Sequence, residues 1–115
     1  VFVSIHKRKR LRGCIGTYLP TKNNIAEEII FNAIAASQDP RFLPVQKEEL
    51  SDLSYEVYVL DKPKLVKNLN ELDPKKFGIL IKSLSSFRSG LLLPGLEGID
   101  NFQQQLFIAC QKAGI

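Results

Sequence analysis

A chain of 115 residues, 44% hydrophobic and 24% charged, lies in the ordinary range for one globular domain. This composition excludes disordered and collagen-like proteins, and two cysteines with one histidine provide too few groups for a disulfide scaffold or a metal cluster. No apolar run approaches the roughly 20 residues that span a bilayer. We therefore expect a cytoplasmic protein with reduced cysteines, no membrane segment, no metal and no cofactor.

The net charge of +4 comes from one short segment. Five of the sixteen basic residues lie there, and the other eleven are balanced by twelve acidic ones; the five are Lys7, Arg8, Lys9, Arg10 and Arg12. Such a cluster attracts phosphates, but it lacks the interleaved aromatic residues on which single-stranded nucleic acid stacks. A solvated turn and a surface for an acidic protein or nucleic acid are both open.

The first predicted elements are two strands that form a hairpin. Residues 1–7 and 11–19 are rich in β-formers and flank a polar turn with Arg8 and Lys9 at its tip. Two-residue hairpin turns favour Gly or Asn because their backbone has positive φ. We therefore expect a longer or a distorted loop.

A helix over about residues 24–37 follows, with Thr21 or Asn23 as its N-cap. Its apolar face is expected to consist of Ile25, Ile29, Ala33 and Ala36. The remaining predicted elements are a helical turn over 46–50, a half-buried strand over 53–60, a hairpin of strands 77–82 and 89–93, and a helix over 100–113 that ends at Gly114. Two hairpins, each followed by a helix, predict an α+β fold with a mainly antiparallel sheet and helices packed on it.

A thiol bracketed by two glycines stands out in the second strand. Gly13 and Gly16 flank Cys14, and glycine in a strand marks a bulge or the close approach of a backbone or ligand. Arg12, on the same side of an ideal strand, would favour a nucleophilic thiolate. The segment is therefore either a reactive cysteine or anion site, or a small buried hydrophobe with glycines that allow tight packing.

A cysteine nucleophile normally needs a base, and the only histidine is His6. A regular hairpin centred on Arg8 and Lys9 places His6 near Leu11 and Cys14 opposite Val3. A Cys/His dyad would therefore need another register.

Three further residues are candidates for binding. Asp39 can accept backbone hydrogen bonds in an Asx turn, which leaves Arg41 free for a carboxylate or phosphate, although a structural turn anchored by Phe42 fits equally well. Glu56, in an apolar strand, faces solvent or pairs with an arginine. Asp39 or Glu56 could also act as the base.

Five motifs, in order and spacing, resemble the AMMECR domain family. They are Leu11–Gly16, Asp39–Phe42, Glu49–Leu53 with Tyr55–Val57, Ser89–Pro94, and Lys112–Gly114. The resemblance implies a curved, barrel-like sheet, two intimately associated subdomains and a cleft near the first motif. It also implies a site at Cys14 and Arg12, with Gly13 and Gly16 in its binding part and Asp39, Arg41 and Glu56 as companions.

The resemblance carries expectations about context as well. Residues 1–115 are expected to form a single AMMECR-type domain, truncated at both ends relative to the family. Family members of the AmmeMemoRadiSam system occur with a Memo-type dioxygenase-like protein and a radical-SAM protein, which are the implied partners. The family commonly carries Asp-Gly at the hairpin tip, where this chain has Arg8-Lys9.

Three functions compete, and the family's reaction is not settled. The first is an enzyme or enzyme component with a thiol site at Cys14. The second is a non-catalytic binding or regulatory module that recognises a protein or nucleic acid through its basic hairpin. The third is a structural subunit, so the sequence leaves open whether the chain is an enzyme.

Overall fold

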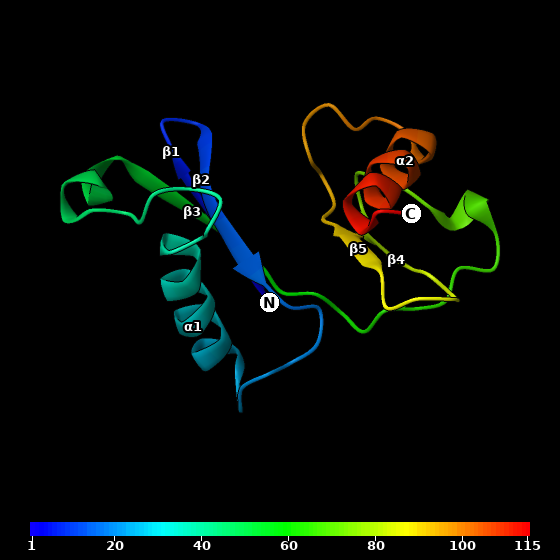
Figure 1. Cartoon of the computed structure of the whole chain (residues 1–115), viewed down its shortest axis with the longest axis horizontal. Helices are drawn as coiled ribbons and strands as arrows, with labels where there is room; N and C mark the ends of the chain where they lie inside the picture. Colours follow the sequence, from blue (N-terminus) through cyan, green and yellow to red (C-terminus); the bar gives the residue numbers. More distant parts are fainter. The chain divides into compact units, whose positions relative to one another are not determined.

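The computed structural model describes all 115 residues, which form two compact units, Val1–Lys62 and Pro63–Ile115. In chain order the elements are β1 (Phe2–Lys7), β2 (Arg10–Gly16), α1 (Ile25–Ser37), the 3-10 helix η1 (Lys47–Asp52), β3 (Leu53–Tyr58), the 3-10 helix η2 (Leu69–Glu71), β4 (Ile79–Lys82), β5 (Ser89–Leu92) and α2 (Phe102–Ala113) (Figure 1). The chain is α+β, as predicted. Neither helix has the length and hydropathy to cross a bilayer.

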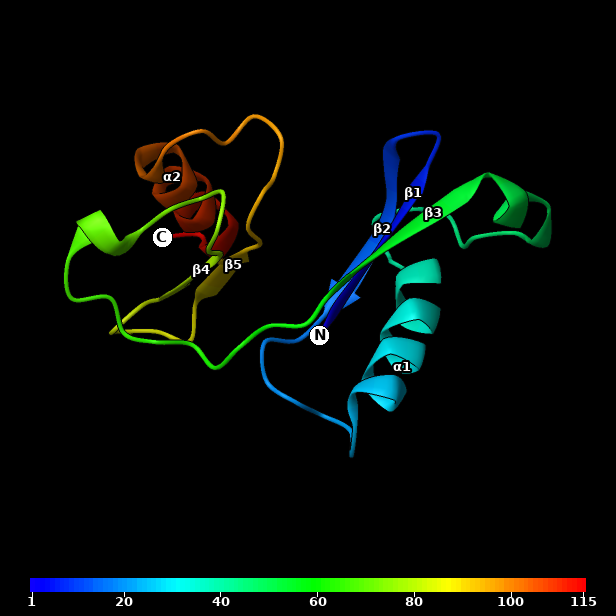
Figure 2. The same ribbon diagram turned by 180° about the vertical axis from the view of Figure 1, so that it is seen from behind.

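The strands are divided between two antiparallel sheets. The first unit holds β2, β1 and β3 in that order, and the second holds the pair β4 and β5. The predicted barrel-like sheet is not confirmed, because no strand joins the two sheets into a closed barrel. In the first unit, α1 packs against β1 and β2, and Figure 2 shows it beside the sheet as seen from behind.

The turn between β1 and β2 consists of only two residues, so the expected longer loop is wrong. Arg8 has φ 50° and Lys9 has φ 67°, so both adopt the left-handed backbone that favours Gly and Asn. The expected distortion therefore takes the form of backbone strain. Arg8 also donates to Asp52 at 3.4 Å, an exposed contact that ties the turn to η1.

Replacing Lys9 by glycine is expected to stabilise the chain by about 1 kcal/mol, because glycine adopts positive φ without steric cost. The Lys9 side chain is exposed, so its removal uncovers little buried surface. Urea denaturation followed by circular dichroism measures the gain. Arg10→Gly, in the strand itself, is the control and should destabilise by about 0.5 to 1 kcal/mol; equal effects of the two changes would contradict the strained turn.

A β-bulge at Arg12 shifts the hairpin register. His6 lies opposite Leu11, as predicted, but Ile5 lies opposite Gly13, so Arg12 has no partner residue on β1. Beyond the bulge, Cys14 is opposite Ser4. The predicted pairing of Cys14 with Val3 is wrong because a regular ladder does not count the extra residue.

Helix α1 begins after Asn24, whose side chain accepts the N–H of Glu27 at 2.9 Å, so the predicted caps Thr21 and Asn23 are wrong. The predicted inner face is also wrong in part, since Ile25 is exposed. The buried residues are Glu28, Asn32 and Ala36, while Ile30, Phe31 and Ile34 are exposed. The residues of α1 that are buried against the sheet are therefore small or polar.

The second unit has its own core beneath α2. Its buried members are Ile79, Leu92, Ile99 and Ala109. A Cβ on Gly90 of β5 would lie 2.4 Å from the Ala109 carbonyl oxygen, so this glycine allows α2 to approach the hairpin. Gly114 ends α2 in the left-handed conformation, as predicted.

Candidate functional site

Three polar side chains form a row across the first sheet, centred on Ser4. Cys14 lies opposite Ser4 on β2, and Glu56 lies opposite Ser4 on β3. Directly paired residues project to the same face, and the Ser4 hydroxyl donates to the Cys14 Sγ at 3.2 Å. The Tyr58 hydroxyl donates to Glu56 Oε2 at 3.1 Å. One sheet face thus carries a half-buried thiol, a hydroxyl and a carboxylate.

His6 lies on the same face of β1 as Ser4, because strand residues two apart project to the same side. It is therefore a diagonal neighbour of Cys14, which lies opposite Ser4. A regular hairpin does not place the two residues this way. The Arg12 bulge thus places the thiol and the only histidine on the same face of the sheet.

Asp39 and Arg41 hold the backbone of Cys14 at the outer edge of β2. Asp39 Oδ2 accepts the Cys14 N–H at 3.0 Å, and the Arg41 guanidinium donates to the Cys14 carbonyl at 3.4 Å. Arg41 also donates to both Asp39 oxygens, at 3.1 Å and 2.7 Å. The loop therefore satisfies the edge of the strand where a further strand would otherwise pair.

Asp39 is ionised throughout the physiological range. It is only 2% exposed, yet the hydrogen bond from the Arg41 side chain, with the N–H groups of Cys14 and Arg41, holds the pKa of its carboxyl well below the ordinary value. Asp39 in turn raises the pKa of Arg41. The predicted Asx turn is confirmed, since Asp39 Oδ1 accepts the Arg41 N–H at 3.0 Å. The expectation that this turn leaves Arg41 free is wrong, because the Arg41 guanidinium binds Asp39 itself.

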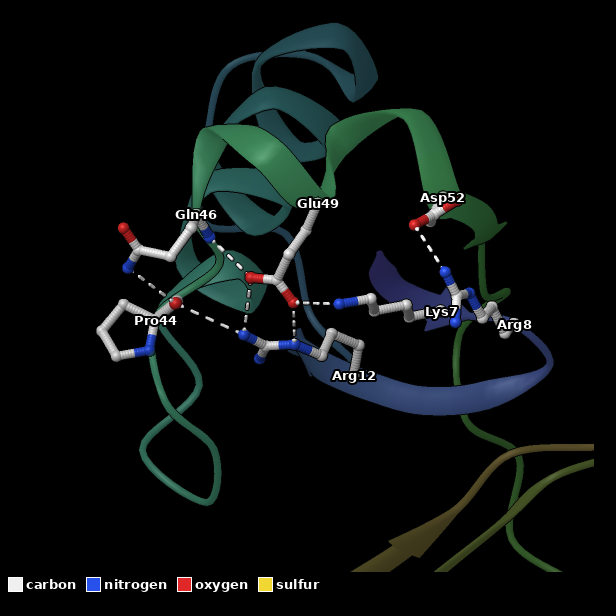
Figure 3. A network of polar contacts seen from close by, with 7 residues as sticks. All are labelled: Lys7, Arg8, Arg12, Pro44, Gln46, Glu49 and Asp52. Carbon is white, nitrogen blue, oxygen red and sulfur yellow. Dashed lines mark hydrogen bonds and ion pairs between the residues drawn. The ribbon is translucent and has the colours of Figure 1, made fainter.

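The Arg12 guanidinium is bound by Glu49 of η1. It donates from Nε to Oε1 at 2.9 Å and from Nη2 to Oε2 at 3.1 Å (Figure 3). Lys7 Nζ reaches the same Oε1 at 3.1 Å, and the Gln46 N–H donates to Oε2 at 2.7 Å. These donors, Arg12 first, lower the pKa of Glu49 to about 2. The charge of Arg12 is therefore paired with the Glu49 carboxylate and not with the Cys14 thiol.

The basic cluster is partly neutralised by η1. Glu49 pairs with Lys7 and Arg12, and Asp52 pairs with Arg8. Lys9 and Arg10 are exposed and have no such partner.

Close packing explains why the Leu11–Gly16 motif has glycine at positions 13 and 16. A Cβ on Gly13 would lie 2.1 Å from the Ala36 carbonyl oxygen of α1, and one on Gly16 would lie 2.3 Å from the Val1 carbonyl oxygen. Both contacts are with backbone, which cannot rotate aside. This supports the packing interpretation of Gly13 and Gly16.

Comparison with known proteins places this chain in a family. The sequence profile of the AMMECR1 family matches residues 1–115. The chain belongs to the AMMECR1 family. A protein of Thermotoga maritima is 54% identical over 116 residues, which cover 99% of this chain and 66% of that protein. A Clostridium acetobutylicum protein is 52% identical, with 24% of its length covered, and a Thermococcus kodakarensis protein is 40% identical, with 61% covered.

This AMMECR1-family chain gathers most of the predicted site residues in its first unit. Cys14, Asp39 and Arg41 are in contact, and Glu56 joins the row through Ser4. Three other participants were not predicted from the sequence: Ser4, Tyr58 and Glu49. Glu49 lies in a motif that carried the resemblance, but no local spacing links it to Arg12.

In this AMMECR1-family chain, Glu49→Gln is expected to lower the denaturation midpoint near neutral pH, because Arg12 and Lys7 lose their shared carboxylate. The folded-state pKa is depressed from 4.5 to about 2, so the contribution of Glu49 is complete above the unfolded-state pKa and is lost as the pH falls toward the folded-state value. Urea denaturation at several pH values measures this. The adjacent, exposed Glu48→Gln is the control, and equal effects at every pH would contradict the network.

Proposed function

We propose that this chain is an enzyme or enzyme component whose substrate binds on the sheet face that carries Cys14, with Cys14 as the reactive group. The observation that carries the proposal is the Ser4–Cys14 contact of 3.2 Å, within a row that continues to Glu56. A half-buried thiol beside a hydroxyl and a carboxylate is a group of the kind that binds or attacks electrophilic substrates.

The roles follow from the neighbours of each side chain. Cys14 is the proposed nucleophile, and His6, its diagonal neighbour, is the proposed base. Arg41, held by Asp39 and within 3.4 Å of the Cys14 carbonyl, is the proposed anchor for an anionic substrate group. Arg12 is proposed to act on this site indirectly, by fixing the bulge through Glu49.

The test is the rate at which iodoacetamide alkylates each cysteine in the folded protein, followed by peptide mass spectrometry. Cys110 on α2, also half-buried, is the internal reference. We expect Cys14 to react faster than Cys110, and Ser4→Ala and His6→Gln each to change the Cys14 rate several-fold. Ser86→Ala, in the exposed β4–β5 loop, is the matched control that should change neither rate. If Cys14 stays inert until the protein unfolds, it is a packing residue and the thiol proposal fails.

A second candidate, a binding module, is favoured by Lys9 and Arg10, the two exposed cations that η1 leaves unpaired. We propose that they contact an acidic partner or nucleic acid. With two phosphate contacts, a plot of log affinity against log salt should have a slope of about −2. Fluorescence anisotropy with a labelled oligonucleotide tests this. Binding that survives Cys14→Ser and is lost in Lys9→Glu/Arg10→Glu supports the module, and binding unaffected by both excludes this surface.

The partners implied by the family resemblance are also a proposal. We propose that the chain works with a Memo-type protein and a radical-SAM protein in the cytoplasm, and the resemblance alone supports this. Calorimetric titration of each purified partner into the chain tests it, and no heat of binding with either protein would count against it.

A further inference from the structure

A pocket in the first unit lies apart from the residues of the proposed thiol site. Its volume is about 330 Å³, at the lower end of the range for small-molecule sites. Its lining combines polar and apolar side chains, among them Tyr18, Lys22, Ile25, Glu28, Val59 and Leu60. Neither Cys14 nor any of its contacts is among the lining residues, so the inference is independent of the proposed function.

Glu28 is the one acidic residue of the lining, and only one of its two carboxylate oxygens accepts hydrogen bonds. It is 3% exposed, and its Oε1 accepts the N–H of Thr21, the N–H of Lys22 at 2.6 Å and the Thr21 hydroxyl at 3.2 Å. Its Oε2 is buried without any hydrogen-bond partner. The donors on Oε1, the Thr21 N–H above all, lower the pKa of Glu28, so the group is a carboxylate. A buried carboxylate oxygen with no donor is costly and requires an explanation.

Lys22, the one basic residue of the lining, does not supply the missing donor. Its Nζ lies over the Phe31 ring, 4.0 Å from the ring centroid. A divalent metal ion is a poor fit, since no second carboxylate, histidine or cysteine lines the pocket. Glu28 Oε2 therefore lacks one hydrogen-bond donor, and a compact N–H group that carries positive charge fits this carboxylate oxygen best.

We propose that this pocket binds a primary ammonium group on a short apolar chain. The ammonium donates to Glu28 Oε2, and the apolar chain contacts Ile25, Val59 and Leu60. Entry requires a small movement of the loop before α1, because Oε2 is closed off from solvent. The Thr21 and Lys22 amides, which bond to the same carboxylate, report directly on occupancy.

The test is a titration of the ¹⁵N-labelled chain with n-butylammonium at fixed pH and ionic strength, followed by NMR. We expect saturable shifts confined to the amides of Thr21, Lys22 and the first turns of α1. Butan-1-ol and butyrate, which match the apolar chain but lack the ammonium, are the ligand controls. Saturable shifts with either of them at similar affinity, or none with n-butylammonium, would overturn the proposal.

Two variants and a control locate the site. Glu28→Gln removes the charge and is expected to weaken binding at least tenfold. Val59→Phe fills the pocket from an exposed position, so the fold should survive while binding is lost. Glu27→Gln, one residue away and exposed, should bind as the parent does. Parent-like binding by both Glu28→Gln and Val59→Phe would refute the site.

A lysine with blocked termini carries the same ammonium on a peptide backbone and identifies the source of the ligand. Tighter binding than n-butylammonium indicates the lysine side chain of a protein segment, and weaker binding indicates a free amine. Both results support the ammonium site. Equal shifts with a blocked norleucine, which lacks the ammonium, would refute it.

Discussion

Gly13→Ala is expected to destabilise the chain by about 3 kcal/mol or more, because the added methyl group has no space to occupy. The new Cβ would lie 2.1 Å from the Ala36 carbonyl oxygen and 3.1 Å from its carbonyl carbon. Both atoms belong to the backbone of α1, so no side-chain rotation relieves the clash. Helix α1 would have to move away from β1 and β2. Since domains of this size are stable by only about 5 to 15 kcal/mol, the loss is a large part of the total.

Urea denaturation measures this loss, and Gly98→Ala separates the clash from ordinary backbone strain. Gly98 has φ 83°, and no atom lies within 4 Å of the position that an alanine methyl group would occupy there. Alanine at Gly98 therefore meets only the left-handed penalty of about 1 to 2 kcal/mol. Gly13 has no positive φ, so its cost comes from the contact with α1. A Gly13→Ala midpoint close to that of the parent would mean that α1 does not approach β2 this closely.

Asp39→Asn is expected to destabilise the chain by about 2 to 3 kcal/mol, the scale of lost hydrogen bonds to a buried charged group. The change keeps the volume of the side chain but removes the charge that binds Arg41 and weakens the bond from the Cys14 N–H. Because Arg41 is partly exposed, water compensates for part of its loss, so the expected effect stays below that for a fully buried pair. The effect should also reach the thiol, because Asp39 fixes the Cys14 backbone.

The pH dependence gives Asp39→Asn a second readout. The folded-state pKa of Asp39 is depressed, so its contribution is complete above the unfolded-state pKa, near 3.8, and is lost as the pH falls toward the folded-state value. The difference between the parent and Asp39→Asn should therefore shrink in acid. Asp52→Asn, which breaks an exposed pair, should cost less than about 1 kcal/mol. A difference that stays constant down to strongly acidic pH would contradict the proposed ionisation.

The elements of the fold were predictable because their signals are local. Strand and helix periodicity located the two hairpins and both α-helices to within a few residues, and Gly114 ended α2 where expected. The cap of α1 was missed by one position, since Asn23 and Asn24 are both good cap residues and only the fold decides between them. The arrangement of the strands in two sheets depends on long-range pairing, which local pattern does not encode.

The inner face of α1 was predicted poorly for a physical reason. Apolar periodicity assumes that a helix buries its largest apolar side chains, but Gly13 draws the α1 backbone so close to β2 that small or polar residues must face the sheet. Glu28 and Asn32 then bond to backbone groups at the ends of neighbouring segments. The sequence alone does not distinguish a buried carboxylate such as Glu28 from a solvent-exposed one.

The candidate site was predicted in its members but not in its contacts. Cys14, Asp39 and Arg41 were recognised from residue type, and the structure joins them through the backbone of Cys14. The partner of Arg12 was missed because Glu49 is 37 residues away in sequence. Ser4 was missed because a regular register places Val3, not Ser4, opposite the cysteine.

The bulge at Arg12 also determines which one-residue deletion the hairpin tolerates. Without Arg12, Leu11 still lies opposite His6 and Gly13 still lies opposite Ile5, so the ladder becomes regular and Cys14 keeps its place opposite Ser4. Deleting Gly13 gives a chain of the same length but moves Arg12 into the position where any Cβ meets the α1 backbone. The two deletions give chains of equal length but are expected to have different effects. The first loses the contacts of the Arg12 side chain with Glu49 and the Pro44 carbonyl, whereas the second displaces a helix.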